Sequence, residues 1–287
     1  MKCKKLLLFL TFVLISLVIP LVNAQPMRDN TSFCYNLNET SGTAAVSCRP
    51  GGFQATASAD TQWVSGLIGN AYNNTDNNYT FIDTVANTNL DIQVMTLSVW
   101  VNMQNRTNND NAYFISIGGR VLLSFSAISG NGVIGSFFDG GTRITASNFT
   151  PANDVWNLFT YVMDNDNDVQ KLYINDTLIA ESHYTGAAAY VTDRCVVVGG
   201  SGDDCNTFTD LQSPDAIIDM AYIFANYTLS QENVSRLYND GIGKQWPYEP
   251  VAPPPETTFT ITAKDEFDSV QLNNISITIS NSSFTFN

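Results

Sequence analysis

The stretch that most constrains the fold is residues 155–182, VWNLFTYVMDNDNDVQKLYINDTLIAES. Apolar and polar side chains alternate through residues 155–163 and 169–174, which is the period of a half-buried antiparallel sheet. A third run, residues 177–180, follows Asn175 and Asp176. These two residue types tolerate the left-handed backbone of a two-residue hairpin turn. The stretch therefore predicts three antiparallel strands joined by two tight turns.

Similar short runs continue on both sides of this stretch. Glycine-rich turns separate them at intervals typical of a sandwich of antiparallel strands. The further predicted strands are residues 112–117, 120–126, 132–138, 143–146, 195–199 and 216–224. One helix is expected over residues 231–239, because Ser230 can cap its start and Gly241 can end it. The sequence predicts an all-β sandwich with one short C-terminal helix.

Residues 1–24 have the composition of a secretory signal peptide. Three lysines precede an apolar run over residues 6–21, and Ala24 supplies the small residue of a cleavage site. The alternative is an uncleaved anchor, because the apolar run approaches the length of a membrane span. We expect cleavage, a secreted or extracellular-surface protein, and no membrane span in the mature chain.

The rest of the chain divides by composition. We expect one large domain over residues 25–249, a stiff proline-rich linker over 250–258, and the incomplete start of a second β domain over 259–287. Further domains of the same polypeptide are therefore expected. The formal net charge is −14. Such an acidic surface disfavours nucleic acid and anionic lipid as partners and suits an extracellular protein or one that binds cations.

The cysteines fit an oxidising compartment. Cys3 lies in the leader, which leaves Cys34, Cys48, Cys195 and Cys205. Four cysteines allow three pairings, and sequence alone does not choose among them. We favour Cys34 with Cys48 and Cys195 with Cys205, since each pair closes a short loop.

Asn-x-Ser/Thr sequons are frequent, which fits either glycosylation in the secretory pathway or simple enrichment in Asn and Thr. The candidate sites are Asn30, Asn38, Asn73, Asn78, Asn105, Asn148, Asn175, Asn226 and Asn233, with two more, Asn274 and Asn281, in the tail.

Several short motifs occur in the order of one known family. They are Trp156 with Tyr161 and LYIN over 172–175, YNLNETSG over 35–42, WVSGLIGNAY over 63–72, MTLSVWV over 95–101, IIDMAYIF over 217–224, and LSQENV with LYNDG over 229–241. Together they resemble a laminin-G-like (LamG/pentraxin type) domain of the concanavalin A-like lectin/glucanase superfamily. The resemblance covers residues 33–246 and implies a jelly-roll β-sandwich.

The resemblance also implies a tentative calcium site. Domains of this family often hold calcium through carboxylates and backbone carbonyls, which a hard cation prefers. The motifs carry this role to Asp76 and Asp219, and Asp203 and Asp204 could line another rim site or form a soluble loop. The turn over residues 164–168 also alternates carboxylates, but it lacks the glycine and glutamate of a calcium-binding loop, so we interpret it as a solvated turn.

No catalytic motif is visible. Glycoside hydrolases of this fold carry paired carboxylates on one strand, and the nearest pair here is Asp215 with Asp219. His183 has no partner nucleophile motif. Aromatic rings that lie near loops could stack on a sugar. These weak ligand-binding candidates are Tyr113, Phe138 and Tyr184, whereas the tryptophans match core positions of the family.

The first functional hypothesis is a non-catalytic extracellular recognition module that binds a glycan or a protein partner, with calcium holding its loops. The alternative is a structural or adhesive spacer of a cell-surface or virion protein. The third is a glycoside hydrolase or lyase that lacks a recognisable motif. Fold-level analogy does not choose among these, because such sandwiches host many functions.

Overall fold

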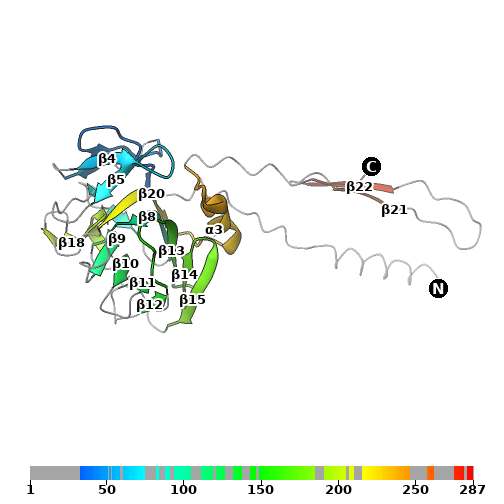
Figure 1. Ribbon diagram of the computed structural model, residues 1–287. Coiled ribbons are helices and arrows are strands. Elements are labelled where there is room, and N and C mark those ends of the chain that lie inside the picture. Colours follow the sequence, from blue (N-terminus) through cyan, green and yellow to red (C-terminus); the bar gives the residue numbers. More distant parts are fainter. Residues whose placement is uncertain are drawn as a thin grey trace, which may run out of the picture. The chain divides into compact units, whose positions relative to one another are not determined.

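A computed structural model shows the architecture (Figure 1). It describes residues 33–50, 52, 54–58, 61–74, 82–83, 88–90, 94–104, 111–118, 121–126, 132–137, 143–146, 149–184, 191–204, 207–209, 215–245, 257–261, 275–280 and 283–286. The chain forms two units, Met27–Tyr248 on the one hand and Met1–Pro26 with Glu249–Asn287 on the other. In the second unit, β21 (Thr257–Ile261), β22 (Ile275–Ser280) and β23 (Ser283–Phe286) form an antiparallel sheet in that order.

Sheet A of the large unit has the order β15-β14-β13-β8-β20-β5-β4, and β1 also pairs with β20. All its pairings are antiparallel. Its strands are β1 (Phe33–Tyr35), β4 (Gln62–Ser65), β5 (Asn70–Asn74), β8 (Val94–Met103), β13 (Trp156–Asp164), β14 (Val169–Ile174), β15 (Thr177–His183) and β20 (Ala216–Ala225). The three strands and two turns predicted over residues 155–182 are β13, β14 and β15.

Sheet B has the order β12-β11-β10-β9-β17-β6-β3-β2. Its strands are β2 (Ala44–Ala45), β3 (Ala55–Ala57), β6 (Ile82–Asp83), β9 (Asn111–Ile117), β10 (Val121–Ser126), β11 (Gly132–Phe137), β12 (Arg143–Ala146) and β17 (Val196–Val198). Two small pairs, β7 (Thr88–Leu90) with β16 (Val191–Arg194) and β18 (Ser201–Asp204) with β19 (Thr207–Thr209), complete the unit. The predicted all-β antiparallel sandwich is confirmed.

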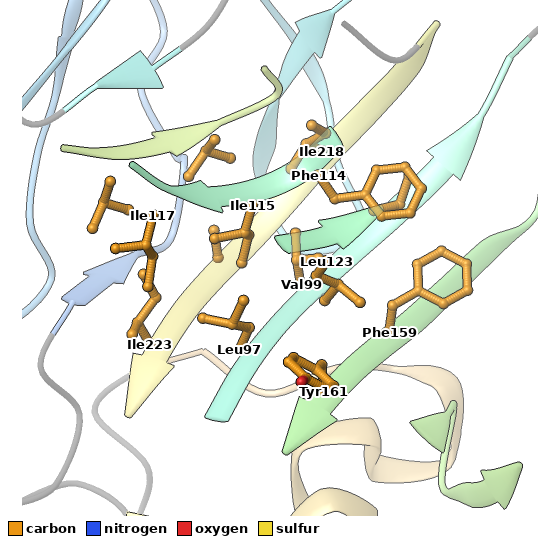
Figure 2. Close-up of a cluster of buried hydrophobic side chains, with 14 of the residues drawn as sticks. Leu97, Val99, Phe114, Ile115, Ile117, Leu123, Phe159, Tyr161, Ile218 and Ile223 are labelled. Carbon is orange, nitrogen blue, oxygen red and sulfur yellow. The ribbon is translucent and has the colours of Figure 1, made fainter. Parts of the chain in front are cut away.

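The inner core lies between the facing surfaces of the two sheets (Figure 2). Alternate residues of β8, including Leu97 and Val99, point into this core together with Phe114 of β9 and Phe159 of β13, whose rings stack with centroids 5.3 Å apart. β8 is buried along almost its whole length, so neither of its faces is open to solvent. A strand buried on both faces must be covered on both, which predicts a second cluster outside sheet A.

That second cluster lies under helix α3 (Gln231–Tyr238). Trp100 of β8 faces outward and stacks on Tyr238 at a centroid distance of 5.6 Å. The Ser230 hydroxyl accepts a hydrogen bond from the Asn233 N–H, which confirms the predicted cap. The helix ends with Asn239 in the left-handed conformation, and a 3-10 turn, Asn239–Gly241, follows. The helical segment thus ends where Gly241 predicts.

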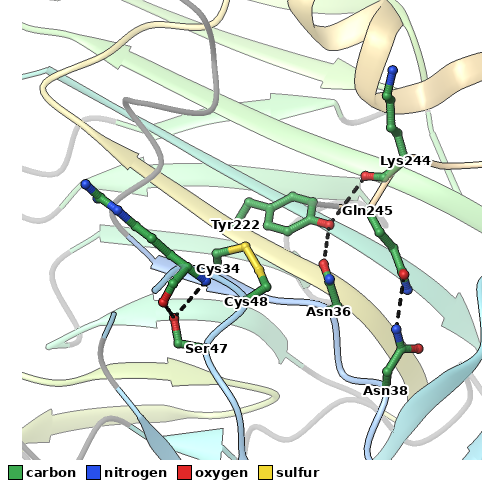
Figure 3. The surroundings of a disulfide bond; sticks show 9 residues. Cys34, Asn36, Asn38, Ser47, Cys48, Tyr222, Lys244 and Gln245 are labelled. Carbon is green, nitrogen blue, oxygen red and sulfur yellow. Dashed lines mark hydrogen bonds between the residues drawn. A yellow bond between two sulfur atoms is a disulfide. The ribbon is translucent and has the colours of Figure 1, made fainter. Parts of the chain in front are cut away.

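Cys34 of β1 and Cys48 form one of the two predicted disulfides (Figure 3). Beside it, the Tyr222 hydroxyl donates to Asn36 Oδ1 at 3.0 Å, and Asn38 Nδ2 donates to Gln245 Oε1 at 3.1 Å. The start and the end of the large unit are therefore joined by side-chain contacts as well as by the β1–β20 pairing. Cys195 is also disulfide-bonded, but its predicted partner Cys205 lies outside the described residues, so that pairing stays a prediction.

Candidate binding surfaces

A row of residues crosses the outer face of sheet B. Tyr113 of β9 stands opposite Ser124, which stands opposite Ile134, which in turn stands opposite Thr145 of β12. Directly paired residues project to the same face of a sheet, so these four form a continuous row. Ser124 and Ile134 are buried in the middle, and Tyr113 and Thr145 are half-exposed at the two ends. The predicted ligand residue Tyr113 therefore lies beside the buried Ser124, and Thr145 lies three strands away at the other end of the row.

A second surface lies at the edge of sheet A. Val155, Leu178 and Ile179 are exposed by 47%, 39% and 43%, and they are three of the five large hydrophobic residues described as exposed. Leu178 and Ile179 belong to β15, the edge strand, and Ile179 is an extra residue between two paired positions, a β-bulge. We call these three residues the β15 patch.

Hydrogen bonds link the turn before Leu178 to the backbone next to Val155. Asn157 donates through Nδ2 to the Val155 carbonyl at 3.1 Å, and its Oδ1 accepts from Asn175 Nδ2 at 3.4 Å. The Asn175 Oδ1 accepts the Leu158 N–H at 3.0 Å. The turn that precedes Leu178 is therefore held against the start of β13, where Val155 lies. Gln231 of α3 donates to the Asp176 carbonyl of the same turn.

Asp219 has a structural role in the folded chain. Its Oδ2 accepts the backbone N–H groups of Leu67 and Ile68 at 3.0 and 3.2 Å, which connects β20 to the β4–β5 turn. A side chain on Gly66 would lie 2.7 Å from the same oxygen, so this turn requires glycine there. Oδ1 is buried without a hydrogen-bond partner. Burial raises the pKa of Asp219 to about 7, although the hydrogen bonds to the Ile68, Leu67 and Met220 N–H groups oppose the shift.

Asp219 alone does not fit a calcium ion, because calcium takes six to eight oxygen ligands and only its Oδ1 is not hydrogen-bonded. Among the described side chains, no three acidic, histidine or cysteine residues group to hold a metal. Asp76 lies outside the described residues, and Asp203 and Asp204 lie on β18 with their side chains undescribed. The predicted calcium site therefore stays a prediction.

The acidic turn between β13 and β14 is closed by its own side chains. Asp164 accepts the Asn167 N–H at 3.1 Å and Asn167 Nδ2 at 2.8 Å, as in a solvated turn. Tyr184, a predicted ligand residue, is buried in the inner core near this turn. Burial, followed by the negative charges of Asp168, Asp164 and Asp166, raises the pKa of its hydroxyl to about 12. A buried ring offers no face for a sugar, so Tyr184 is a packing residue.

The remaining predicted residues are dispersed. Phe138 lies outside the described residues, as do the sequon residues Asn30, Asn78, Asn105 and Asn148. Asp215 is buried at the start of β20, and His183 is exposed at the end of β15. The β15 patch was not predicted, because Leu178 and Ile179 have the composition of an ordinary buried strand. The signal that could have identified it is two adjacent apolar residues in a strand where alternation predicts one.

Comparison with known protein families matches residues 73–235 to the Concanavalin A-like lectin/glucanases superfamily. The chain belongs to this superfamily. The resemblance seen in the short motifs is thereby confirmed over more than half of the chain. Curated proteins give no significant match.

Solved structures of low identity share the fold. Domain 4 of AbnA, an extracellular arabinanase of Geobacillus stearothermophilus solved with arabinotriose, aligns with a TM-score of 0.52 and 13% identity over 75% of this chain and 98% of that one. The binding domain of Paraclostridial Mosquitocidal Protein 1 aligns at 0.57 and 12% over 88% and 64%. The binding domain of botulinum neurotoxin serotype D aligns at 0.56 and 13% over 90% and 74%.

In the described part of the chain, no helix has the length and apolar composition needed to cross a lipid bilayer.

Proposed function

We propose that this chain is an extracellular, non-catalytic recognition module that binds carbohydrate through the outer face of sheet B. The superfamily and the binding-domain neighbours support a binding role. The observation that carries the choice of ligand is the row from Tyr113 to Thr145. It has at one end the half-exposed Tyr113 ring, whose face can stack on a pyranose or furanose, and at the other end the half-exposed Thr145 hydroxyl, which can both donate and accept hydrogen bonds to sugar hydroxyls.

The described carboxylates do not favour catalysis. Glycosidases use two carboxyl groups that flank the scissile bond. Asp219 is fully buried against backbone N–H groups, and Asp215 is buried at the start of the same strand. Neither carboxyl group stands on the row around Tyr113. Release of new reducing ends from a polysaccharide incubated with the chain would support the hydrolase hypothesis instead.

A glycan array probed with the full chain tests the proposal. We expect binding to a defined set of oligosaccharides, and we expect Tyr113→Ala to weaken it at least about tenfold, or about 1.4 kcal/mol. Tyr113→Phe should retain most of the affinity, because it keeps the ring. The matched control is Ile179→Ser, which changes an exposed residue of the other surface and should leave binding intact. No bound glycan, or equal binding by Tyr113→Ala at an unchanged thermal midpoint, would contradict the proposal.

The β15 patch favours a second candidate, recognition of a protein partner. Exposed apolar residues on a strand edge are typical of protein interaction sites. A ligand whose binding is lost in Ile179→Ser and kept in Tyr113→Ala would move the site to this patch.

Calcium dependence and a larger modular protein around this domain also remain proposals. Calcium dependence is tested by running the same array with calcium and with excess chelator. If the ion is required, glycan binding should be lost in chelator. The spacer hypothesis predicts no ligand in either condition.

A further inference from the structure

The described sequons differ in whether the asparagine amide is available. We propose that Asn226 carries an N-linked glycan in the exported protein and that Asn175 and Asn233 do not. This inference rests on the extracellular location in the proposed function, but it does not depend on the ligand. It separates sites that the sequence pattern treats as equivalent.

The backbone around Asn226 is fixed by hydrogen bonds, and its side chain faces solvent. Its backbone N–H donates to the Val94 carbonyl at 2.7 Å, while its side chain is exposed. The Thr96 hydroxyl donates to the Tyr227 carbonyl at 3.1 Å and accepts the Leu229 N–H at 3.0 Å. Residues 227 and 229 are thus anchored to β8.

Of the two residues that define the sequon, Asn226 precedes the anchored residue 227, and Thr228 lies between the anchored residues 227 and 229. Asn226 is exposed and Thr228 is half-exposed, and both alternate with the anchored residues. The φ of Asn226 is 57°, a left-handed conformation that asparagine tolerates better than most residues. Asparagine and threonine of the sequon can therefore both be reached from solvent without displacing a strand.

Asn233 is in the opposite situation. It lies on the buried side of α3, is only 6% exposed, and donates through Nδ2 to the Tyr227 hydroxyl at 3.1 Å. Its neighbours Val234 and Leu237 pack against sheet A in the second cluster, which lies under α3. A glycan on this nitrogen would have to separate α3 from the sheet, so a chain modified there could not complete the fold.

Asn175 is held by both atoms of its amide. Oδ1 accepts the Leu158 N–H at 3.0 Å, and Nδ2 donates to Asn157 Oδ1 at 3.4 Å. A sugar on Nδ2 would point into the start of β13. The β15 patch beside this turn therefore stays uncovered.

Asn38 is exposed, but its Oδ1 accepts the Asn70 N–H at 3.1 Å and its Nδ2 donates to Gln245 at 3.1 Å.

The reaction is a glycosyl transfer from a lipid diphosphate-linked oligosaccharide, supplied by the secretory pathway. A bond forms between Asn226 Nδ2 and the anomeric carbon of the sugar, and the bond from that carbon to the diphosphate oxygen breaks. The amide proton passes to a base of the transferase, and the lipid diphosphate leaves. The chain itself contributes the acceptor Asn226 and the hydroxyl residue Thr228.

The test is expression of the full chain with its own leader in a eukaryotic secretory host. Glycopeptide mass spectrometry and the intact mass before and after peptide N-glycosidase locate each glycan. Thr228→Ala removes the sequon and keeps Asn226, so we expect the loss of one glycan mass. The matched variant Ser235→Ala removes the sequon of Asn233, and we expect no change in glycan mass.

Secreted protein that is bare at Asn226, or that carries a glycan at Asn175 or Asn233, overturns the inference and leaves the recognition function standing. Failure of the chain to reach the medium, with every sequon unmodified, overturns both the extracellular location and the inference. Glycan binding that fails on the array, with Asn226 occupied, removes the proposed ligand alone.

Discussion

Replacement of Asp219 by asparagine should remove a large part of the pH dependence of stability. The folded-state pKa of about 7 lies above the ordinary value of 3.8, so the folded chain holds a proton that the unfolded chain loses. At 1.36 kcal/mol per pH unit, this difference corresponds to at most about 4 kcal/mol. The contribution is fully present below pH about 4 and is lost as the pH rises to about 7. The free energy of unfolding should therefore fall over this interval.

Asp219→Asn keeps an oxygen that can accept the Leu67 and Ile68 N–H groups, and its NH2 group replaces an oxygen that has no partner. Any cost of burying that NH2 group is the same at every pH, so the slope isolates the titration. We expect urea unfolding at pH 4.5, 5.5, 6.5 and 7.5, with calcium chelated, to show a flatter profile for the variant by about 2 to 4 kcal/mol.

The matched control is Asp166→Asn, which makes the same substitution in an exposed turn and tests whether the loss of one carboxylate is enough to flatten the profile. Equal slopes for wild type and Asp219→Asn would refute the reasoning, because they would show that this carboxyl group titrates as it does in the unfolded chain.

Two further predictions concern the sandwich itself. Replacing Cys34 and Cys48 together by serine should lower the free energy of unfolding by about 3 kcal/mol, since the disulfide closes a loop with a sequence separation of 14. A loss well below that in urea unfolding would show that the β1–β20 pairing holds this segment by itself. Gly135→Ala should cost about 1 to 3 kcal/mol, because a Cβ there would overlap the Tyr161 ring across the inner core. An unchanged thermal midpoint for this variant would mean that the ring can move aside.

Local pattern was enough to predict the strands, their turns and the helix. The alternation over residues 155–174 is a consequence of side-chain period, and the Asn175–Asp176 turn and the Ser230 cap depend on residues adjacent in sequence. Cys34 and Cys48, which follow one another in the order of cysteines along the sequence, are also bonded partners. The motifs in their order were sufficient to predict the superfamily.

Only the tertiary structure decided what each candidate residue does. Period 2 shows which residues share a face, but it does not show which face is covered or which strand ends at an edge. Tyr184 is therefore buried although it lies near a loop, and Leu178 and Ile179 are exposed although they have core composition. Asp219 accepts hydrogen bonds from residues about 150 positions away, a contact that depends on the pairing of β4, β5 and β20. Sequence by itself determined the layers of this protein, whereas the stacking of those layers decided which side chains can meet a ligand.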